Sequence, residues 1–180
     1  MLIRRPSYLK RIRDVFRRNP VCALLGPRQC GKTTLARQFV AADSLNYFDL
    51  EDPPSLARLS EPDTALRSLR GLVVIDEAQL QPALFPVLRV LADRKPLPAR
   101  FLLLGSASPD LFGSAGESLA GRVARIEMAG FSLAEAGISR WRELWWRGGL
   151  PRSFLAEDDA ESVRWREDFI ATFLERDLRR

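Results

Sequence analysis

The sequence contains no histidine and only two cysteines, Cys22 and Cys30. Without histidine, imidazole-based acid–base catalysis and histidine-ligated metal centres are excluded. The two cysteines are poorly placed for a structural disulfide, so a reducing cytoplasm is the expected location. No apolar run approaches the roughly 20 residues of a membrane-spanning helix, and the first residues have no apolar signal core. We therefore expect no membrane association.

Acidic residues are slightly outnumbered: 28 lysines and arginines stand against 23 aspartates and glutamates, for a net charge of +5. An excess of this size does not by itself indicate nucleic-acid binding. With 180 residues, the chain is long enough to bury a core of its own without disulfides. We expect one domain, or one domain with part of another.

The stretch around which the chain is organised fits the phosphate-binding pattern G-x-x-x-x-G-K-[ST]. Its residues are Gly26, Pro27, Arg28, Gln29, Cys30, Gly31, Lys32, Thr33 and Thr34. An apolar run at 21–25 precedes it, and a helical pattern at 34–40 follows it. Strand, glycine loop and helix form the setting that this motif requires. We therefore predict that residues 26–34 bind the phosphates of a nucleotide.

The residue types in this loop explain how it would bind phosphate. Gly26 and Gly31 allow backbone angles that turn successive N–H groups inward as a nest. The first turn of the following helix adds unpaired N–H groups and the positive end of its dipole. Lys32 is predicted to bring a positive charge to the β- and γ-phosphates, and the hydroxyl of Thr33 to ligate Mg²⁺.

A second informative stretch is residues 72–77, in which four apolar residues are followed by Asp76 and Glu77. The pattern is typical of a buried parallel strand whose acids emerge at its carboxyl end, where open α/β sheets bind ligands. This is the Walker B pattern. Asp76 is predicted to hold Mg²⁺ through water, and Glu77 to polarise the water that attacks the nucleotide.

Ser106 is a candidate for the same site. The apolar run at 101–104 fits the extra strand that some P-loop ATPases place between the phosphate-loop strand and the Walker B strand. Ser106 would then lie between Lys32 and Glu77 as a polar sensor of the γ-phosphate or the water. A plain helix N-cap, at Ser106 or Ser108, is an equal alternative.

Arg122 lies between a helix expected at 109–120 and a strand expected at 123–128. This end of the sheet is opposite the chain's own nucleotide, which disfavours a role there in cis. Two interpretations stay open. Arg122 acts on the nucleotide of a neighbouring subunit, or it forms a salt bridge with a local acid.

Other periodic segments complete an alternation of strands and helices. A second strand at 45–50 is expected at the sheet edge, so the nearby carboxylates of Asp49 and Glu51 are assigned structural or capping roles. Two short helices are predicted within 55–70, broken at Pro62, and a further helix at 82–93.

The N-terminal segment 7–18 is predicted to be a helix with one apolar face. Basic residues surround that face: Arg4, Arg5, Lys10, Arg11, Arg13, Arg17 and Arg18. A solvated basic face on a docked helix is the favoured interpretation. The alternative is a phosphate-contacting surface that binds DNA, with an affinity that falls steeply with salt.

From Phe131 the composition changes, and we place a domain boundary there: a core at 1–130 and a helical extension at 131–180. The extension is expected to hold a short helix at 132–136, an aromatic cluster on Trp141, Leu144, Trp145 and Trp146, and a turn at 148–151. A long helix from about 160 carries an apolar face made by Trp165, Phe169, Ile170, Phe173 and Leu174. Such a face indicates a partner surface or further sequence.

The motifs, in their order, carry a family resemblance. They are the phosphate loop at 26–34, the acids at 76–77, Leu104-Gly105-Ser106, Glu117 to Arg122, Gly148 to Pro151 and Phe173 to Asp177. Together they resemble the prokaryotic AAA-like ATPases that carry a C-terminal, nuclease-like domain of unknown function. Members are usually longer, and this chain resembles their N-terminal half. The resemblance implies that Arg122 matches the position of an arginine finger that acts in trans.

The patterns and the resemblance predict an α/β protein: a three-layer αβα P-loop NTPase with a five-stranded parallel sheet of the additional-strand (ASCE/AAA) type and a partial helical C-terminal extension. The expected function is hydrolysis of ATP to ADP and phosphate with Mg²⁺, in a homo-oligomer if Arg122 acts in trans. The alternative is a nucleotide-gated switch that binds DNA or protein and hydrolyses little. A small-molecule kinase ranks last, because Glu77 and Ser106 indicate water as the acceptor.

Overall fold

The computed structural model describes residues 3–106 and 119–177, with side chains as far as Phe173. By its internal contacts the chain divides into two compact units. The sheet unit comprises Pro6–Arg28 and Lys32–Met128, and the helical unit comprises Met1–Arg5, Gln29–Gly31 and Ala129–Arg180. The helix expected at 109–120 and Ser108 lie outside the described residues.

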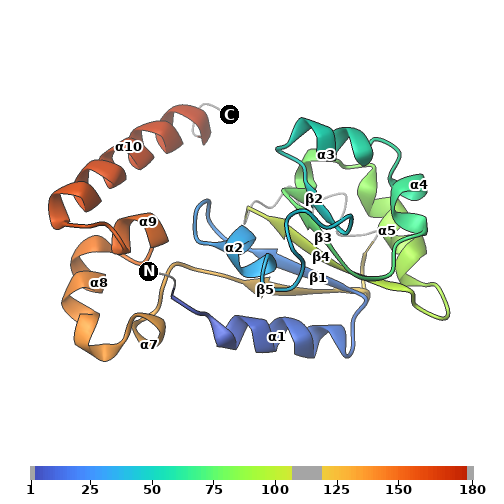
Figure 1. Ribbon diagram of the computed structural model, residues 1–180, viewed down its shortest axis with the longest axis horizontal. Coiled ribbons are helices and arrows are strands. Elements are labelled where there is room, and N and C mark those ends of the chain that lie inside the picture. The colour runs from blue at the N-terminus through green and yellow to red at the C-terminus, as the bar shows by residue number, and fades with distance from the viewer. Residues whose placement is uncertain (1–2, 107–118, 178–180) are drawn as a thin grey trace. The chain divides into compact units, whose positions relative to one another are not determined.

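The sheet unit contains five strands, all paired in parallel, in the order β2-β3-β4-β1-β5 (Figure 1). Their bounds are β1 Val21–Leu25, β2 Tyr47–Asp49, β3 Gly71–Asp76, β4 Ala99–Gly105 and β5 Val123–Glu127. Strand β4 lies between β1 and β3, which confirms the additional-strand arrangement. Strand β2 lies at one edge, as predicted.

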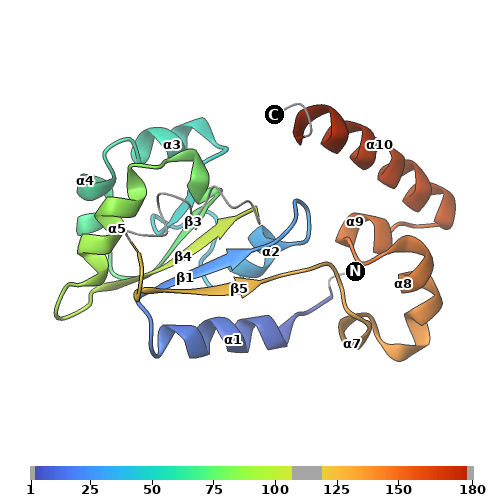
Figure 2. The ribbon, with the colours of Figure 1, turned by 180° about the vertical axis from the view of Figure 1, so that it is seen from behind.

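Helices cover both faces of this sheet. The helices of the sheet unit are α1 Pro6–Phe16, α2 Lys32–Ala36, α3 Pro53–Arg58, α4 Pro62–Arg67 and α5 Leu84–Ala92, with a 3₁₀ turn η1 at Ala78–Leu80. Helix α2 lies on the face of the sheet that is turned to the viewer in Figure 1. Helix α5 lies on the opposite face, which is turned to the viewer in Figure 2. The fold is thus the predicted three-layer arrangement. Because both faces are covered, every residue of β1 is buried, as are the last four of β3.

Helix α2 is shorter than predicted. It ends at Ala36 instead of continuing to residue 40. The chain goes on in turns that include tighter i→i−3 hydrogen bonds, such as Gln38 N–H to Leu35 O at 3.1 Å and Phe39 N–H to Ala36 O at 2.9 Å. A helix of five residues has a small dipole, so the backbone of the loop and the side chains must supply most of the attraction for an anion.

Helix α1 has the expected solvated basic face, but Arg5 is not part of it. Ile12 and Val15 are buried beneath it. Arg13 lies over the ring of Phe39, and Arg17 lies 3.5 Å from the Asp14 carboxylate, so the face is solvated and internally paired. Arg5 does not belong to it. It is 4 % exposed, because carbonyl and carboxylate groups of the helical unit surround its guanidinium.

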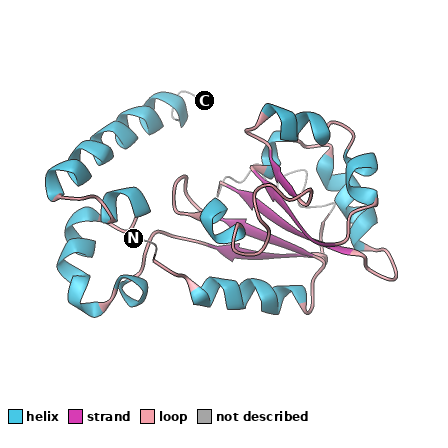
Figure 3. Ribbon diagram, viewed as in Figure 1, coloured by secondary structure: helices cyan, strands magenta, loops and turns pink. Residues whose placement is uncertain are grey.

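Within residues 129–177 the structure has helices and loops and no strand (Figure 3). The helices are α7 Leu133–Ala136, α8 Trp141–Arg147, α9 Pro151–Phe154 and α10 Asp159–Asp177, with a 3₁₀ turn η3 at Ile138–Arg140. Phe154 is fully buried and meets Phe131 edge-on at 5.7 Å between ring centroids. The guanidinium of Arg140 lies 4.2 Å from the centroid of the same ring.

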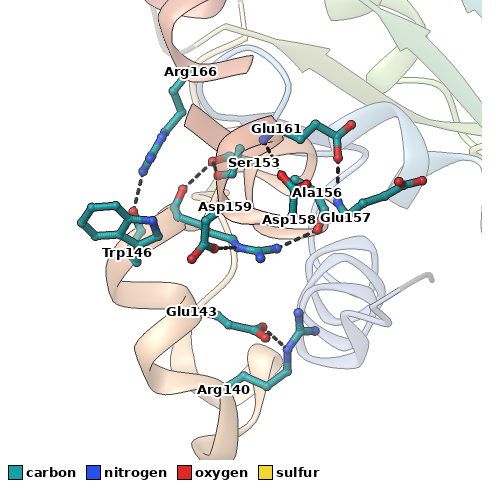
Figure 4. A network of polar contacts seen from close by, with 12 residues as sticks. Arg140, Glu143, Trp146, Ser153, Ala156, Glu157, Asp158, Asp159, Glu161 and Arg166 are labelled. Carbon is teal, nitrogen blue, oxygen red and sulfur yellow. Dashed lines mark hydrogen bonds and ion pairs between the residues drawn. The ribbon is translucent and has the colours of Figure 1, made fainter. Parts of the chain in front are cut away.

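A polar network joins α8, α9 and the start of α10 (Figure 4). Arg147 bonds the Asp159 carboxylate at 2.7 Å and the Ala156 carbonyl at 2.6 Å. The buried hydroxyls of Ser153 and Ser162 lie 2.8 Å apart. Since these buried polar groups are all partnered, the network fixes how the three helices join.

Two glycines let the backbone cross itself in the helical unit. A Cβ on Gly130 would lie 2.5 Å from the backbone of Gly149, and Phe131 N–H bonds the Gly149 carbonyl at 2.6 Å. Gly148 has a positive φ of 75°. The Gly-Gly-Leu-Pro turn is therefore built for close backbone approach.

The aromatic residues of α8 do not form a core. Trp141, Trp145 and Trp146 are 51 %, 86 % and 57 % exposed. On α10 the expected aromatic face is present, since the Trp165, Phe169 and Phe173 rings stack in sequence at centroid distances of 5.1 and 6.0 Å.

Leu103 tests the core of the sheet unit. It is fully buried on β4, paired beside Ala23 and Ile75. Leu103→Ala should lower the free energy of unfolding by about 2–5 kcal/mol, because a cavity replaces packed methyl groups. Urea unfolding followed by circular dichroism measures this. Leu45→Ala, at a position 74 % exposed, is the control and should cost less than about 0.5 kcal/mol. Equal costs for the two variants would contradict the assigned core.

Candidate functional site

The glycine-rich loop follows the carboxyl end of β1 and begins beside the end of β4. Gly26 N–H bonds the Gly105 carbonyl at 3.3 Å, which ties the start of the loop to the sheet. Gln29 and Gly31 have positive φ values of 62° and 99°. Left-handed backbone within such a loop helps successive N–H groups turn to one side, as in an anion-binding nest. Gly31 adopts it without strain, since it has no side chain.

Lys32 is buried, at 5 % exposure. Its ammonium donates to the carbonyl oxygens of Gly26 at 2.8 Å and Pro27 at 3.0 Å. No carboxylate pairs with it in the part of the chain that the structure describes. Buried charges in proteins are nearly always paired. Two carbonyl dipoles compensate a full charge incompletely, so the arrangement suits an anion at the loop.

Thr33 and Asp76 are brought together as predicted. The Thr33 hydroxyl donates to Oδ2 of Asp76 at 2.7 Å, across the gap between α2 and the end of β3. Glu77 N–H donates to the other carboxylate oxygen at 3.1 Å. A hydroxyl and a carboxylate are hard oxygen ligands that suit Mg²⁺, which commonly takes only one or two protein ligands beside phosphates. The residues therefore fit a magnesium–nucleotide site.

Tyr47 contacts the same carboxylate, a contact that the sequence reasoning missed. Its hydroxyl donates to Oδ2 of Asp76 at 3.1 Å from the edge strand β2. The contact depends on the register of β2 beside β3, in which Tyr47 lies opposite Val74. A strand pattern alone does not give that register, so no signal in the sequence identified the tyrosine.

The pKa of Asp76 is raised above its ordinary value. Burial is the main cause, and the neighbouring charges of Asp49 and Glu77 act in the same direction. Hydrogen bonds from Thr33 and Tyr47 oppose the shift. Burial also raises the pKa of Tyr47, so its hydroxyl stays a donor. A cation near Asp76 would favour its charged form.

Glu77 is held in an unusual conformation directly after β3. Its backbone is left-handed, with φ 52° and ψ 46°. Its carboxylate Oε2 accepts a hydrogen bond from Nε2 of Gln79. Among the described residues, the buried Oε1 of Gln79 has no partner. A left-handed non-glycine residue is costly, and such strain gathers at functional sites. Gln79 was not singled out from the sequence.

Ser106 and Arg122 lie at opposite ends of the sheet. Ser106 directly follows β4, whose last residue, Gly105, pairs with Leu25 at the start of the loop. Arg122 precedes β5, and its carbonyl accepts from Val21 N–H at the start of β1. Its guanidinium bonds both oxygens of Asp93 at 2.7 Å. In this chain Arg122 thus forms the local salt bridge, away from the phosphate loop.

The carboxylates after β2 have the local contacts that were expected. Oδ1 of Asp49 accepts from Glu51 N–H at 3.1 Å and closes the turn. Glu51 lies 4.0 Å from Arg28 of the loop, with both side chains exposed. Asp52 caps α3 by accepting from Ser55 N–H at 3.3 Å.

Matches to known families cover the chain from residue 18 onward. Residues 18–137 match the model of a family described as an AAA domain, and residues 138–180 match a domain of unknown function (DUF8612). Two curated relatives, the uncharacterized proteins Rv2008c of Mycobacterium tuberculosis and Mb2031c of Mycobacterium bovis, are each 53 % identical over 99 % of this chain. The chain spans 40 % of the length of each.

Solved structures show the same fold at low sequence identity. The Walker-type ATPase PABY2304 of Pyrococcus abyssi is 15 % identical, with a TM-score of 0.70 over 97 % of this chain and 75 % of that one. A STAND-type signal-transduction ATPase of Pyrococcus horikoshii is 16 % identical, with a TM-score of 0.50 over 92 % of this chain and 28 % of that one. Within the described residues, no helix is both long and apolar enough to span a bilayer.

The raised pKa of Asp76 predicts how stability varies with pH. The folded protein binds this proton more tightly than the unfolded chain, so ionisation of Asp76 costs stability as the pH rises above its ordinary pKa of about 3.9. Asp76→Asn removes that cost. Without Mg²⁺ and nucleotide, the unfolding free energy of Asp76→Asn should increase relative to that of the parent as the pH rises above about 4, the ordinary pKa of an aspartate.

Urea unfolding at several pH values measures this difference. Exposed Asp43→Asn is the control and should show no such gain. If the difference between Asp76→Asn and the parent stays constant, or shrinks as the pH rises, the assigned environment of Asp76 is wrong.

Proposed function

We propose, from the premise that this chain belongs to the AAA domain family of P-loop NTPases, that it binds ATP with Mg²⁺ and hydrolyses it to ADP and phosphate. The observation that carries the proposal is the buried ammonium of Lys32, which has no acidic partner in the described chain. A triphosphate would supply the missing negative charge.

The loop residues would bind the phosphate chain. Backbone N–H groups of 28–34 would donate to phosphate oxygens, and Lys32 would exchange its carbonyl contacts for the β- and γ-phosphates. The hydroxyl of Thr33 would ligate Mg²⁺ and Asp76 would hold it through water; the two side chains already lie close together, with their oxygens 2.7 Å apart. When bound, Mg²⁺ offsets charge on the phosphates.

Glu77 would orient and polarise the attacking water. It is the acid next to the metal ligand, and Gln79 holds its carboxylate in one position. Ser106, at the end of the neighbouring strand, would sense the γ-phosphate or the water. Arg122 would act on the nucleotide of a neighbouring subunit, which requires it to leave Asp93.

Variants at Lys32 and Glu77 distinguish nucleotide binding from nucleotide hydrolysis. Lys32→Ala should weaken ATP binding by about tenfold or more, because a charge-assisted contact is worth about 1.5–3 kcal/mol. Glu77→Gln should bind ATP like the parent yet hydrolyse it about a hundredfold more slowly. Calorimetric titration and a phosphate-release assay measure the two effects. Exposed Lys10→Ala is the matched control and should leave both unchanged. Unchanged binding in Lys32→Ala would reject this site.

A second function, a nucleotide-gated switch with little hydrolysis, is favoured by the state of Arg122. Asp93 bonds its guanidinium through two contacts, which raise the pKa of Arg122 and lower that of Asp93. An arginine finger supplies about 10³–10⁵ in rate, so a monomer whose arginine is occupied elsewhere would turn over very slowly. ATP would then act mainly by changing a surface for DNA or protein.

Turnover per subunit, measured against protein concentration, distinguishes the two functions. If Arg122 acts in trans, the rate per subunit should rise with concentration, and Arg122→Ala should lower the plateau by about 10³-fold or more. Exposed Arg70→Ala is the matched control. A low rate that does not vary with concentration, together with tight ATP binding, would support the switch.

Two further proposals concern the partners and the location of the protein. The solvated arginines of α1 are compatible with DNA contact, and the internal pairs of Arg13 and Arg17 reduce the charge that they offer. Cys22 and Cys30 are buried and form no disulfide, which supports a reducing cytoplasm. Burial raises the pKa of Cys22 to about 12, so its thiol is unreactive. Because the chain spans 40 % of its curated relatives, activities of the longer proteins are not assigned to it.

A further inference from the structure

Arg5 has a fully occupied guanidinium. Its five N–H groups make five hydrogen bonds to five different acceptor atoms. Nε and Nη2 bond the two carboxylate oxygens of Glu135 at 2.6 and 3.0 Å. The remaining donors reach the carbonyls of Cys30 at 3.2 Å, Ala129 at 2.9 Å and Gly130 at 3.1 Å. Arginine has five donors in a rigid fork, and lysine could not make these contacts.

The acceptors around Arg5 are themselves held in place. Arg5 lies over the Phe131 ring at 5.4 Å, next to the tight crossing of Gly130 and Gly149. Glu135 also completes the capping box of α7, since its Oε2 accepts from Ser132 N–H and Oγ at 2.9 Å. Burial opposes ionisation of Glu135, but bonds from Arg5 and Ser132 outweigh it and lower the pKa, so the pair is charged.

One of these acceptors belongs to the phosphate-binding loop. The carbonyl of Cys30 is part of the Cys30–Gly31 peptide, and a trans peptide directs its N–H opposite to its C=O. Arg5 therefore fixes the direction of the Gly31 N–H, immediately before Lys32. Gly31, with φ 99°, has no side chain to restrict its backbone, so without Arg5 this peptide would be poorly fixed.

We propose that Arg5 is a positioning residue for the phosphate-binding loop, held in place by Glu135. The inference rests on the proposed binding of nucleotide. It adds that affinity for phosphates depends on a residue outside the loop and outside the AAA match at 18–137. Glu135 and the carbonyls of 129–130 hold Arg5. The conformation of residues 129–135 and the binding of phosphates to the loop would therefore be coupled, and such coupling acts in both directions.

The test compares three variants in the full chain. Arg5→Ala removes all five bonds and should weaken ATP binding by about tenfold or more. Arg5→Lys keeps the positive charge opposite Glu135 but loses the forked set of guanidinium donors. Compared with Arg5→Ala, it should therefore restore the stability of the fold more than the affinity for ATP. Exposed Arg4→Ala is the matched control and should bind ATP within about twofold of the parent. Calorimetric titration with Mg-ATP and with inorganic pyrophosphate measures affinity, and circular dichroism confirms folding.

Glu135→Gln tests whether the carboxylate acts through Arg5. The amide oxygen can still cap α7, but the charge is lost. Glu135→Gln should weaken the binding of both ligands, as Arg5→Ala does. The double variant Arg5→Ala with Glu135→Gln should bind them no more weakly than Arg5→Ala alone. A merely structural role would lower the unfolding midpoint and leave the affinity for pyrophosphate unchanged in folded protein.

The outcomes separate this inference from the proposed function. If the parent fails to bind Mg-ATP, the proposed function fails and this inference fails with it. If the parent binds and folded Arg5→Ala or Arg5→Lys binds both ligands equally well, only the role of Arg5 is overturned. If Arg5→Ala does not fold, Arg5→Lys decides.

Discussion

The burial of one ammonium group beside a glycine-rich turn is the constraint on which the described core depends. Lys32 is held by carbonyl oxygens alone, with no acid beside it in the described chain. The carboxylate of Asp76, at the end of β3, accepts hydrogen bonds from Thr33, Tyr47 and the backbone of Glu77 instead. The acid of Asp76 and the hydroxyl of Thr33 thus form a pair, and Lys32, next to Thr33 in the sequence, carries an incompletely compensated positive charge. This combination suits a metal-bound phosphate.

Much of this could be predicted from the sequence, where the information was local. The apolar runs predicted the strands, because a parallel sheet buried on both faces leaves continuous hydrophobic segments. The place of β4 between β1 and β3 was predicted from the likeness to P-loop ATPases that have an additional strand. The closeness of Thr33 and Asp76 followed from two motifs that come after the carboxyl ends of β1 and β3, which lie on either side of β4 in the parallel sheet. The length of α2 was overestimated, since its apolar spacing continues through turns that are not α-helical.

The contacts that sequence reasoning missed are non-local. Tyr47 reaches Asp76 only because β2 pairs with β3 in one register, and Arg5 meets Glu135 across almost the whole chain. Arg5 looked like another basic residue beside α1, and only the fold shows it buried with every donor used. It belongs to one compact unit with residues 29–31 and 129–180, a unit that combines segments far apart in the sequence.

The central claim is that the loop and the pair Thr33–Asp76 hold a magnesium-bound triphosphate. Its most direct test is a calorimetric titration of the 180-residue chain with ATP, in the presence and absence of Mg²⁺. The account predicts saturable binding at one site, tighter with Mg²⁺ than without it. Folded protein that gives no saturable heat with millimolar Mg-ATP or Mg-GTP, or that binds equally well without the metal, would contradict it.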